Sequence, residues 1–267
     1  MTGVQTCALP ISPPSRIGYC LKDFVDYRIG LEVYPSEEEK NWIRKLYYAE
    51  VAYIDSCIGI YMDKLRDSGI YDRSMIIITA DHGEEFWEHN EFEHGHNMHR
   101  EVINVPLIIK FPYQKRQIIV DEKVSMLKLA PTILHACGIE YDENMLQPFV
   151  YNNNGGLLLE DDLFEEEIYC DGTLYYDYRK SVIYEDYKFM RSTERDYHRL
   201  YDIEKDPLET DPFTQVSEGV ISAADSLFAD YRDWSEEVRI KFSIEEEDAL
   251  NRKNIDESGL RSIGYAK

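Results

Sequence analysis

The chain has few basic residues and no long apolar run, and each lack excludes a class of protein. It contains 29 Lys and Arg residues against 52 Asp and Glu, which gives a formal net charge of −23. Neutralisation of phosphates by basic side chains supplies most of the affinity for nucleic acids, so DNA and RNA are excluded as partners. No apolar run approaches the ~20 residues that a membrane-spanning helix needs, so no membrane span is predicted.

Paired cysteines and a recognisable leader are also lacking. None of the five cysteines lies in a C-x-x-C pair, which argues against a disulfide framework and against a structural zinc site. No charged region followed by an apolar region opens the chain, so no signal peptide is identified and the localisation stays open. Residues 1–12, MTGVQTCALPIS, resemble a translated sequencing adapter. We therefore expect residues 1–20 to be a non-native or disordered start, and the natural N-terminus to be absent.

The patterning that is present indicates an α/β layered domain. The hydrophobic content of 43% is typical of a globular protein. Ser36 and Glu39 form a capping box before a helical apolar pattern that ends at Gly69. The continuous apolar run at 75–80 is typical of a strand buried on both faces of a parallel sheet, and 105–111 predicts another strand. A helix is expected over 125–137, with Pro131 starting a new helix.

The pattern of apolar and aromatic residues changes after about residue 140. Residues 152–156 predict a loop, the tyrosine-rich segments 167–178 and 181–191 predict antiparallel strands, and 217–242 predicts an amphipathic helix. The aromatic residues there suit packing of a small sheet better than a surface for carbohydrate stacking. We therefore expect the α/β domain to occupy residues 21–156 and a smaller α+β subdomain to occupy residues 157–267.

The histidine-rich segment from 79 to 112 is the candidate functional site. Asp81 and His82 follow the strand predicted at 75–80, and sites in α/β sheets form at the carboxyl ends of strands. A carboxylate beside an imidazole suits a divalent ion, and Gly83 lets the backbone turn away so that both side chains can face it. The plain alternative is a surface Asp–His pair at a strand-to-loop junction.

Further histidines and carboxylates follow in the same segment. His94 and His96 could donate hydrogen bonds to an anion or protonate a leaving oxygen, and alternation predicts that only one of them faces the metal. His89 is expected to fix the loop, and His99 to lie at the surface. The remaining carboxylates are expected to divide between loop-fixing contacts and solvated charge: Glu84, Glu85, Glu88, Glu91 and Glu93.

The order of these residues resembles the sulfatases of the alkaline-phosphatase superfamily. The similarity covers TADHGE at 79–84, EH at 88–89, HGH at 94–96 and VPLII at 105–109. It extends to the helical stretch at 48–59, to the stretch LAPTIL at 129–134, to LYDIEKDPLET at 200–210 and to the tail near 260–265. The fold that it implies is part of an alkaline-phosphatase-like α/β/α layered sheet with a smaller C-terminal α+β subdomain.

The resemblance also implies a chemistry. Asp81 and His82 would be metal ligands, with calcium expected first and manganese or zinc as alternatives. His94, with His96 as a second candidate, would contact the sulfate as the catalytic histidine. The metal would stabilise charge on the ester oxygens. The substrate would be a sulfated small molecule or glycan, and the oligomeric state stays unknown.

The nucleophile is where the sequence departs from the family pattern. A formylglycine made from a C/S-x-P-x-R motif is expected in a part of the protein that precedes this chain. Ser12 to Arg16 spells S-x-P-S-R, but it lacks the following Thr-Gly and is interpreted as a coincidence. The chain alone is therefore expected to be inactive.

Two other functions stay open at this stage. One is a phosphodiesterase, phosphonate-monoester hydrolase or phosphotransferase of the same superfamily, because sulfate and phosphate esters present similar oxyanions. The other is a non-enzymatic metal-binding protein that uses the His/Glu loop.

Overall fold

The computed structural model describes residues 35–142, 145–146, 148–152, 156–158, 167–172, 178–192 and 194–241. Within these ranges the chain forms two compact units, each described here by itself. The first unit contains residues 35–94, 104–118 and 156, and the second contains 95–103, 119–152 and residues from 157 onward. The predicted domain ranges 1–20, 21–156 and 157–267 stay predictions.

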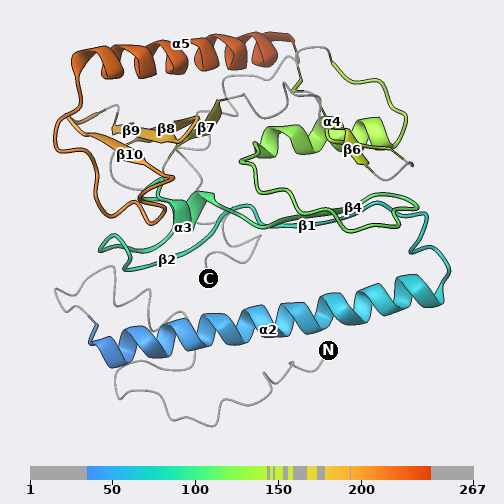
Figure 1. The fold of residues 1–267 in the computed structure, drawn as a ribbon. Coiled ribbons are helices and arrows are strands. Elements are labelled where there is room, and N and C mark those ends of the chain that lie inside the picture. Colours follow the sequence, from blue (N-terminus) through green and yellow to red (C-terminus); the bar gives the residue numbers. More distant parts are fainter. Residues whose placement is uncertain are drawn as a thin grey trace. The chain divides into compact units, whose positions relative to one another are not determined.

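A long helix, α2 (Glu37–Asp67), opens the first unit (Figure 1). The predicted capping box is present: Ser36 Oγ accepts from the Glu39 N–H at 3.3 Å, and Glu39 Oε2 accepts from the Ser36 N–H at 2.7 Å. The helix stops where the sequence predicts, because Gly69 adopts φ +69°, a conformation that glycine reaches without a Cβ penalty.

Two strands of the first unit form a sheet pair, but the expected parallel arrangement is wrong. Strand β1 (Ile76–Thr79) pairs antiparallel with β4 (Leu107–Lys110), with Ile77 opposite Ile109. Residues 80–106 between them hold only short elements and no long crossover helix, which is the usual connection between parallel strands. The strands are also not buried on both faces, since Ile108 is 59% exposed.

A small hairpin follows β1 in the same unit. Strands β2 (Glu85–Phe86) and β3 (Phe92–Glu93) pair antiparallel, and Phe86 and Phe92 pack with Trp42 and Ile43 of α2. Arg44 of α2 donates to the Phe86 carbonyl at 2.7 Å. Apolar packing and the hydrogen bond of Arg44 thus fix the hairpin to the amino-terminal half of α2.

The second unit contains an antiparallel sheet in the order β10-β9-β8-β7, which Figure 1 shows beneath helix α5 (Glu218–Lys241). Val182 and Phe189 of the sheet pack against Ala224 and Phe228 of the helix. The antiparallel strands predicted from the segments 167–178 and 181–191 are confirmed, and the chain turns between two of them at Glu185, where φ is 50°. The strands are β7 (Ile168–Asp171), β8 (Arg179–Tyr184), β9 (Tyr187–Ser192) and β10 (His198–Asp202).

The opposite face of this sheet has its own apolar cluster. Met190 and Tyr201 pack there with Met98, which precedes the short helix α3 (Arg100–Ile103). Residues 98–103 therefore belong to the packing of the second unit, although they follow the histidine cluster directly in sequence.

The segment 125–137 of the second unit follows the prediction. A 3₁₀ turn η1 (Met126–Lys128) leads into α4 (Leu129–Ala136), and Pro131 lies in the first turn of α4, where its missing N–H is tolerated. Strands β5 (Val150–Asn152) and β6 (Gly156–Leu158) form a two-stranded sheet. Among the described helices, none has both the length and the apolar character required to cross a bilayer.

Candidate functional site

The candidate site begins two residues after strand β1 ends. The Asp81 side chain is 84% exposed, and one of its oxygens accepts the His82 N–H at 3.0 Å. His82 Nε2 lies 3.8 Å from the same oxygen, Oδ1. The strand end therefore presents a carboxylate oxygen and an imidazole nitrogen side by side, as the sequence predicts.

The backbone fixes the tautomer of His82. Its Nδ1 lies 2.8 Å from the Gly83 carbonyl oxygen, which only accepts, so Nδ1 carries the hydrogen and donates. In the neutral ring Nε2 then keeps its lone pair on the side of Asp81. An imidazole that donates one ring N–H to a backbone carbonyl is the usual arrangement of a metal-binding histidine.

His94 lies against His82 in the same unit. The two rings stack with centroids 3.7 Å apart and planes inclined by 27°. His94 Nδ1 is 3.2 Å from Glu84 Oε1, and this hydrogen bond is the main cause that raises the pKa of His94, with burial opposing it. His94 is thus biased toward the protonated, donating form, whereas the tautomer of His82 leaves a lone pair at Nε2.

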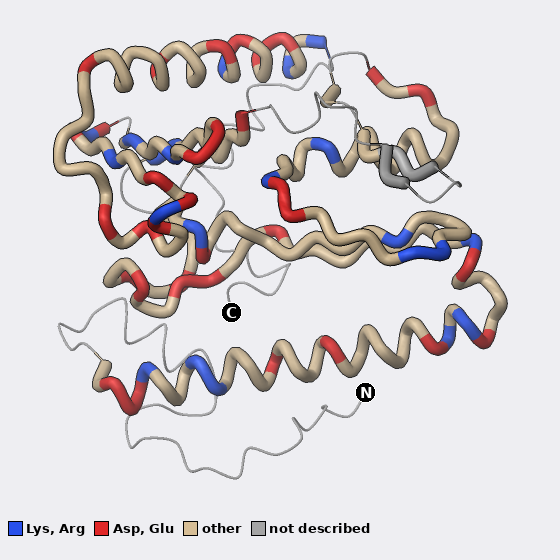
Figure 2. Tube along the Cα trace, in the orientation of Figure 1, with Lys and Arg blue, Asp and Glu red and all other residues tan. Residues whose placement is uncertain are grey.

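The β2–β3 hairpin between these residues is rich in acidic residues, which Figure 2 shows in red. One of them, Glu85, is fully buried, and its Oε1 accepts the backbone N–H groups of His89 at 2.9 Å and Glu91 at 2.8 Å. This contact confirms the predicted loop-fixing role for part of the acidic set. Trp87 and Glu93 adopt φ values of 68° and 71°, which are uncommon outside glycine.

The other candidate histidines belong to the second unit. Of the predicted pair, His94 contacts His82 within the first unit, whereas His96 is 1% exposed within the second. His99 was expected at the surface, and that expectation is wrong: it is 6% exposed and its Nδ1 lies 3.0 Å from Glu209 Oε2. Its partner is 110 positions away in the chain, which no local pattern reveals.

A buried lysine of the second unit was not predicted from the sequence. Lys188 of β9 has no exposed side-chain surface, and its Nζ lies 2.8 and 2.9 Å from the two carboxylate oxygens of Glu209. The only hint in the sequence was the match of the stretch 200–210, which contains Glu209, to a family pattern.

The donor atoms of Asp81 and His82 fit a divalent ion. Two atoms 3.8 Å apart can both contact one ion at about 2.0–2.6 Å, the range of protein–metal bonds. Two ligands alone hold a metal weakly, because structural and catalytic sites use three or more protein donors or added water.

Comparison with known proteins decides the family. The family model described as sulfatase matches residues 31–139, and the model described as N-sulphoglucosamine sulphohydrolase, C-terminal, matches residues 87–220, about half of the chain. The chain belongs to the sulfatase family. It is 36% identical over 104 residues to arylsulfatase K of Danio rerio and 34% identical over 110 residues to that of Bos taurus. The matches cover 39% and 41% of this sulfatase-family chain but only 20% of each relative.

Solved structures show the same fold. A protein in complex with its substrate D-glucosamine-2-N,6-O-disulfate superposes with a TM-score of 0.60 at 20% identity, covering 81% of this chain and 46% of that protein. The phosphonate monoester hydrolase of Agrobacterium radiobacter gives a TM-score of 0.61 at 20% identity, covering 74% and 43%. The expected alkaline-phosphatase-like sulfatase fold is therefore confirmed.

Proposed function

We propose that this chain supplies the metal- and sulfate-binding part of a sulfuric ester hydrolase site. The observation that carries the proposal is the stacked pair of His82 and His94. Hydrogen bonding gives one ring a lone pair beside a carboxylate and biases the other toward a proton. A metal ion and an oxyanion need these two opposite properties next to one another.

Each residue has a distinct role in this proposal. Asp81 and His82 would hold a divalent ion, with calcium expected first and manganese or zinc as alternatives. When bound, the ion supplies positive charge for the developing negative charge on the ester oxygens. His94 donates a hydrogen bond to a sulfate oxygen, and Glu84 favours its protonated form by raising its pKa. His96 stays a second candidate for contact with the sulfate.

The nucleophile is proposed to lie outside these residues. No cysteine of the chain is followed by the x-P-x-R pattern required for formylglycine. We therefore expect the 267-residue chain alone to bind the ion and the anion weakly and to hydrolyse nothing.

The proposed substrate class is sulfated sugars. It rests on a neighbour of the same fold that binds a disulfated glucosamine and on the match to the C-terminal model of N-sulphoglucosamine sulphohydrolase. The described surface has no feature that selects one sugar, so the proposal stops at the class.

A phosphonate monoester hydrolase is the second candidate. The neighbour from Agrobacterium radiobacter shares the fold at a similar TM-score, and a metal beside a protonated histidine suits either tetrahedral oxyanion. A metal-buffering protein is the third candidate, and it predicts much tighter zinc binding than two ligands would give.

Calorimetric titration of the chain tests these alternatives. We expect weak Ca²⁺ binding, with a Kd on the order of 1 mM, and Ca²⁺-dependent binding of sulfate that His94→Gln removes. Asp81→Asn should remove the metal binding itself. The matched control is His135→Gln, which changes an exposed histidine on α4.

Three results would contradict the proposal. Tight Zn²⁺ binding without anion binding would support metal buffering. Preference for a phosphonate over sulfate would support the phosphonate hydrolase. Steady hydrolysis of an aryl sulfate by the chain would refute the view that it holds only part of the site.

A further inference from the structure

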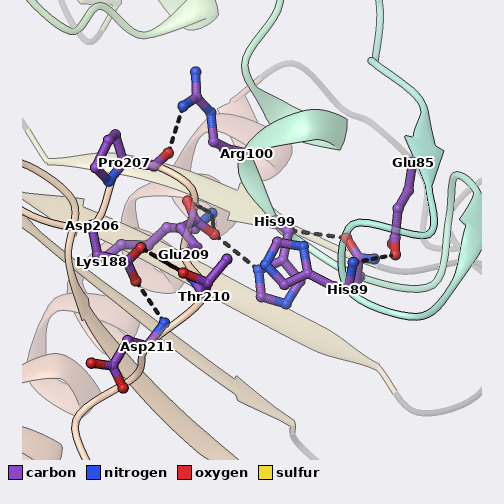
Figure 3. Close-up of polar contacts among 11 residues, drawn as sticks. Glu85, His89, His99, Arg100, Lys188, Asp206, Pro207, Glu209, Thr210 and Asp211 are labelled. Atoms are coloured by element: carbon purple, nitrogen blue, oxygen red, sulfur yellow. Dashed lines mark hydrogen bonds and ion pairs between the residues drawn. The ribbon is translucent and has the colours of Figure 1, made fainter.

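Three titratable side chains of the second unit form a buried network, drawn in Figure 3. Lys188 Nζ contacts both oxygens of Glu209 at 2.8 and 2.9 Å, and His99 Nδ1 contacts Glu209 Oε2 at 3.0 Å. Their side chains are 0%, 3% and 7% exposed for Lys188, Glu209 and His99. Burial of charge on this scale is costly, and an apolar replacement of similar volume is often as stable. The net contribution of the network to stability is therefore expected to be small.

What the network holds is the segment that carries His96. Residues 96–99 are all buried, from 1% exposure at His96 to 6% at His99. Asn97 Oδ1 accepts the His99 N–H at 2.9 Å, which closes a tight turn. Met98 packs with Met190 and Tyr201 on the sheet. The residues that make these contacts all belong to the second unit.

A second contact fixes the far side of the same segment. Arg100 Nη1 donates to the Pro207 carbonyl at 2.6 Å, and Pro207 lies two residues before Glu209 (Figure 3). The turn that contains residues 206–211 is itself closed by Asp206, whose carboxylate accepts from the N–H groups of Thr210 and Asp211 at 3.1 and 2.8 Å. One ordered turn therefore contacts the segment at both His99 and Arg100.

The ionisation of the network agrees with this arrangement. Burial acts to raise the pKa of Glu209, but the hydrogen bonds and charges of His99 and Lys188 outweigh it, and the pKa is lowered. Burial lowers the pKa of Lys188, although Glu209 opposes this, and Cys170 and Glu101 also favour its charged form. Glu209 is thus a carboxylate, which accepts the Nδ1–H of His99.

We infer that Glu209 is a positioning residue that, through His99, fixes the backbone and the ring of His96. The inference rests on the proposed function of His96. It follows from the geometry because three peptide units join His96 to His99, and the Asn97 turn makes that link stiff. Apolar packing by Met98 alone would hold the segment without selecting one orientation, whereas the directional hydrogen bond of His99 selects one.

Site-resolved hydrogen exchange on the full 267-residue chain tests the inference. His99→Leu removes the donor, so we expect exchange at residues 97–103 to rise at least tenfold, and the His96 ring resonances to shift. His99→Gln keeps an N–H that can donate to Glu209, so it should restore most of the protection. A packing role predicts the reverse order, because leucine is the more apolar side chain.

Controls separate local loosening from global loss of stability. Phe228→Leu, in the cluster beneath α5, should lower the stability of the fold as a whole. Exchange at Val182 and Phe189 and exchange at residues 97–103 should then rise by the same factor. The double variant Lys188→Met with Glu209→Leu removes the acceptor of His99 without leaving a buried charge unpaired, and it serves as the second variant should His99→Leu not fold, with the same expected local rise. Equal loosening of both regions by the His99 or Glu209 variants would overturn the inference.

A final arm separates this inference from the proposed function. Asp81→Asn should leave the exchange pattern at 97–103 unchanged while it removes Ca²⁺ binding. If His99→Leu raises exchange at residues 97–103 but the chain binds no sulfate, the positioning role of Glu209 stands and the proposed function falls. If sulfate binds but His99→Leu leaves exchange at residues 97–103 unchanged, the proposed function stands and the positioning role falls.

Discussion

Two clusters of this chain combine histidine with carboxylates, and they differ in exposure and in hydrogen bonding. In the first unit, Asp81, His82 and His94 are partly open to solvent, with side-chain exposures of 84%, 31% and 26%. In the second unit, His99 and Glu209 are buried and joined to Lys188. The same residue types therefore form one accessible cluster and one closed cluster.

The difference teaches which cluster can bind a ligand. His82 Nε2 lies beside the exposed oxygen of Asp81, and a metal ion can reach both atoms. In the closed cluster the Glu209 carboxylate already accepts from Lys188 and His99, so its oxygens are used within the protein. Residue type alone does not separate a binding site from an internal support, and burial together with hydrogen-bond partners does.

The largest expected effect comes from breaking the closed cluster. Glu209→Leu leaves Lys188 buried without its carboxylate and should lower the free energy of unfolding by about 3–5 kcal/mol. The double variant Lys188→Met with Glu209→Leu removes both charges and should recover most of that loss. Urea denaturation monitored by circular dichroism measures both. An equal loss of unfolding free energy in the single and double variants would show that the unpaired charge of Lys188 does not cause the loss.

Changing the open cluster should affect binding and leave stability nearly intact. Because Asp81 is largely exposed, Asp81→Asn should change the free energy of unfolding by no more than about 0.5 kcal/mol. The Ca²⁺ affinity should fall at least about tenfold, since a ligand is lost. The same denaturation series and a calcium titration provide the two measurements. A large loss of stability would mean that Asp81 is structural.

The smallest expected effect concerns the proton on His94. Glu84 raises the pKa of His94, so Glu84→Gln should lower that pKa toward the ordinary value, as followed by NMR titration of the ring. Because the folded pKa is raised, the pair stabilises the fold below the unfolded pKa of about 6.5 and loses this contribution as pH rises through the folded pKa. The stability change should be below about 1 kcal/mol, because the pair is only half-buried. An unchanged pKa would contradict the assignment of Glu84.

Local features of the fold were predictable from the sequence. The capping box at Ser36, the helix stop at Gly69 and the helix over 217–242 follow from short-range chemistry, and the structure confirms them. The antiparallel pairing of β1 with β4 was not predictable, because an apolar run has the same appearance in either orientation. The position of the turn at Glu185 and Asp186 was not predicted, because Asp186 is the only residue there with a turn preference.

The candidate site was predictable only in part, for the same reason. Asp81, His82 and His94 lie within fourteen positions of one another, so a family pattern at short spacing could indicate them together. The partners of His99 come from Lys188 and Glu209, far along the chain, and their contact depends on how β9 and the 206–211 turn fold. Long-range polar networks of this kind leave no periodic signal in a sequence.

The most direct test of the contrast between the two clusters is a titration of the chain with paramagnetic Mn²⁺, followed at the ring resonances of its histidines. The account predicts that the signals of His82 and His94 broaden at the lowest Mn²⁺ concentration, while those of His99 and of the exposed His135 stay sharp. Broadening of His99 first, or no preference for His82 and His94 over His135, would contradict it.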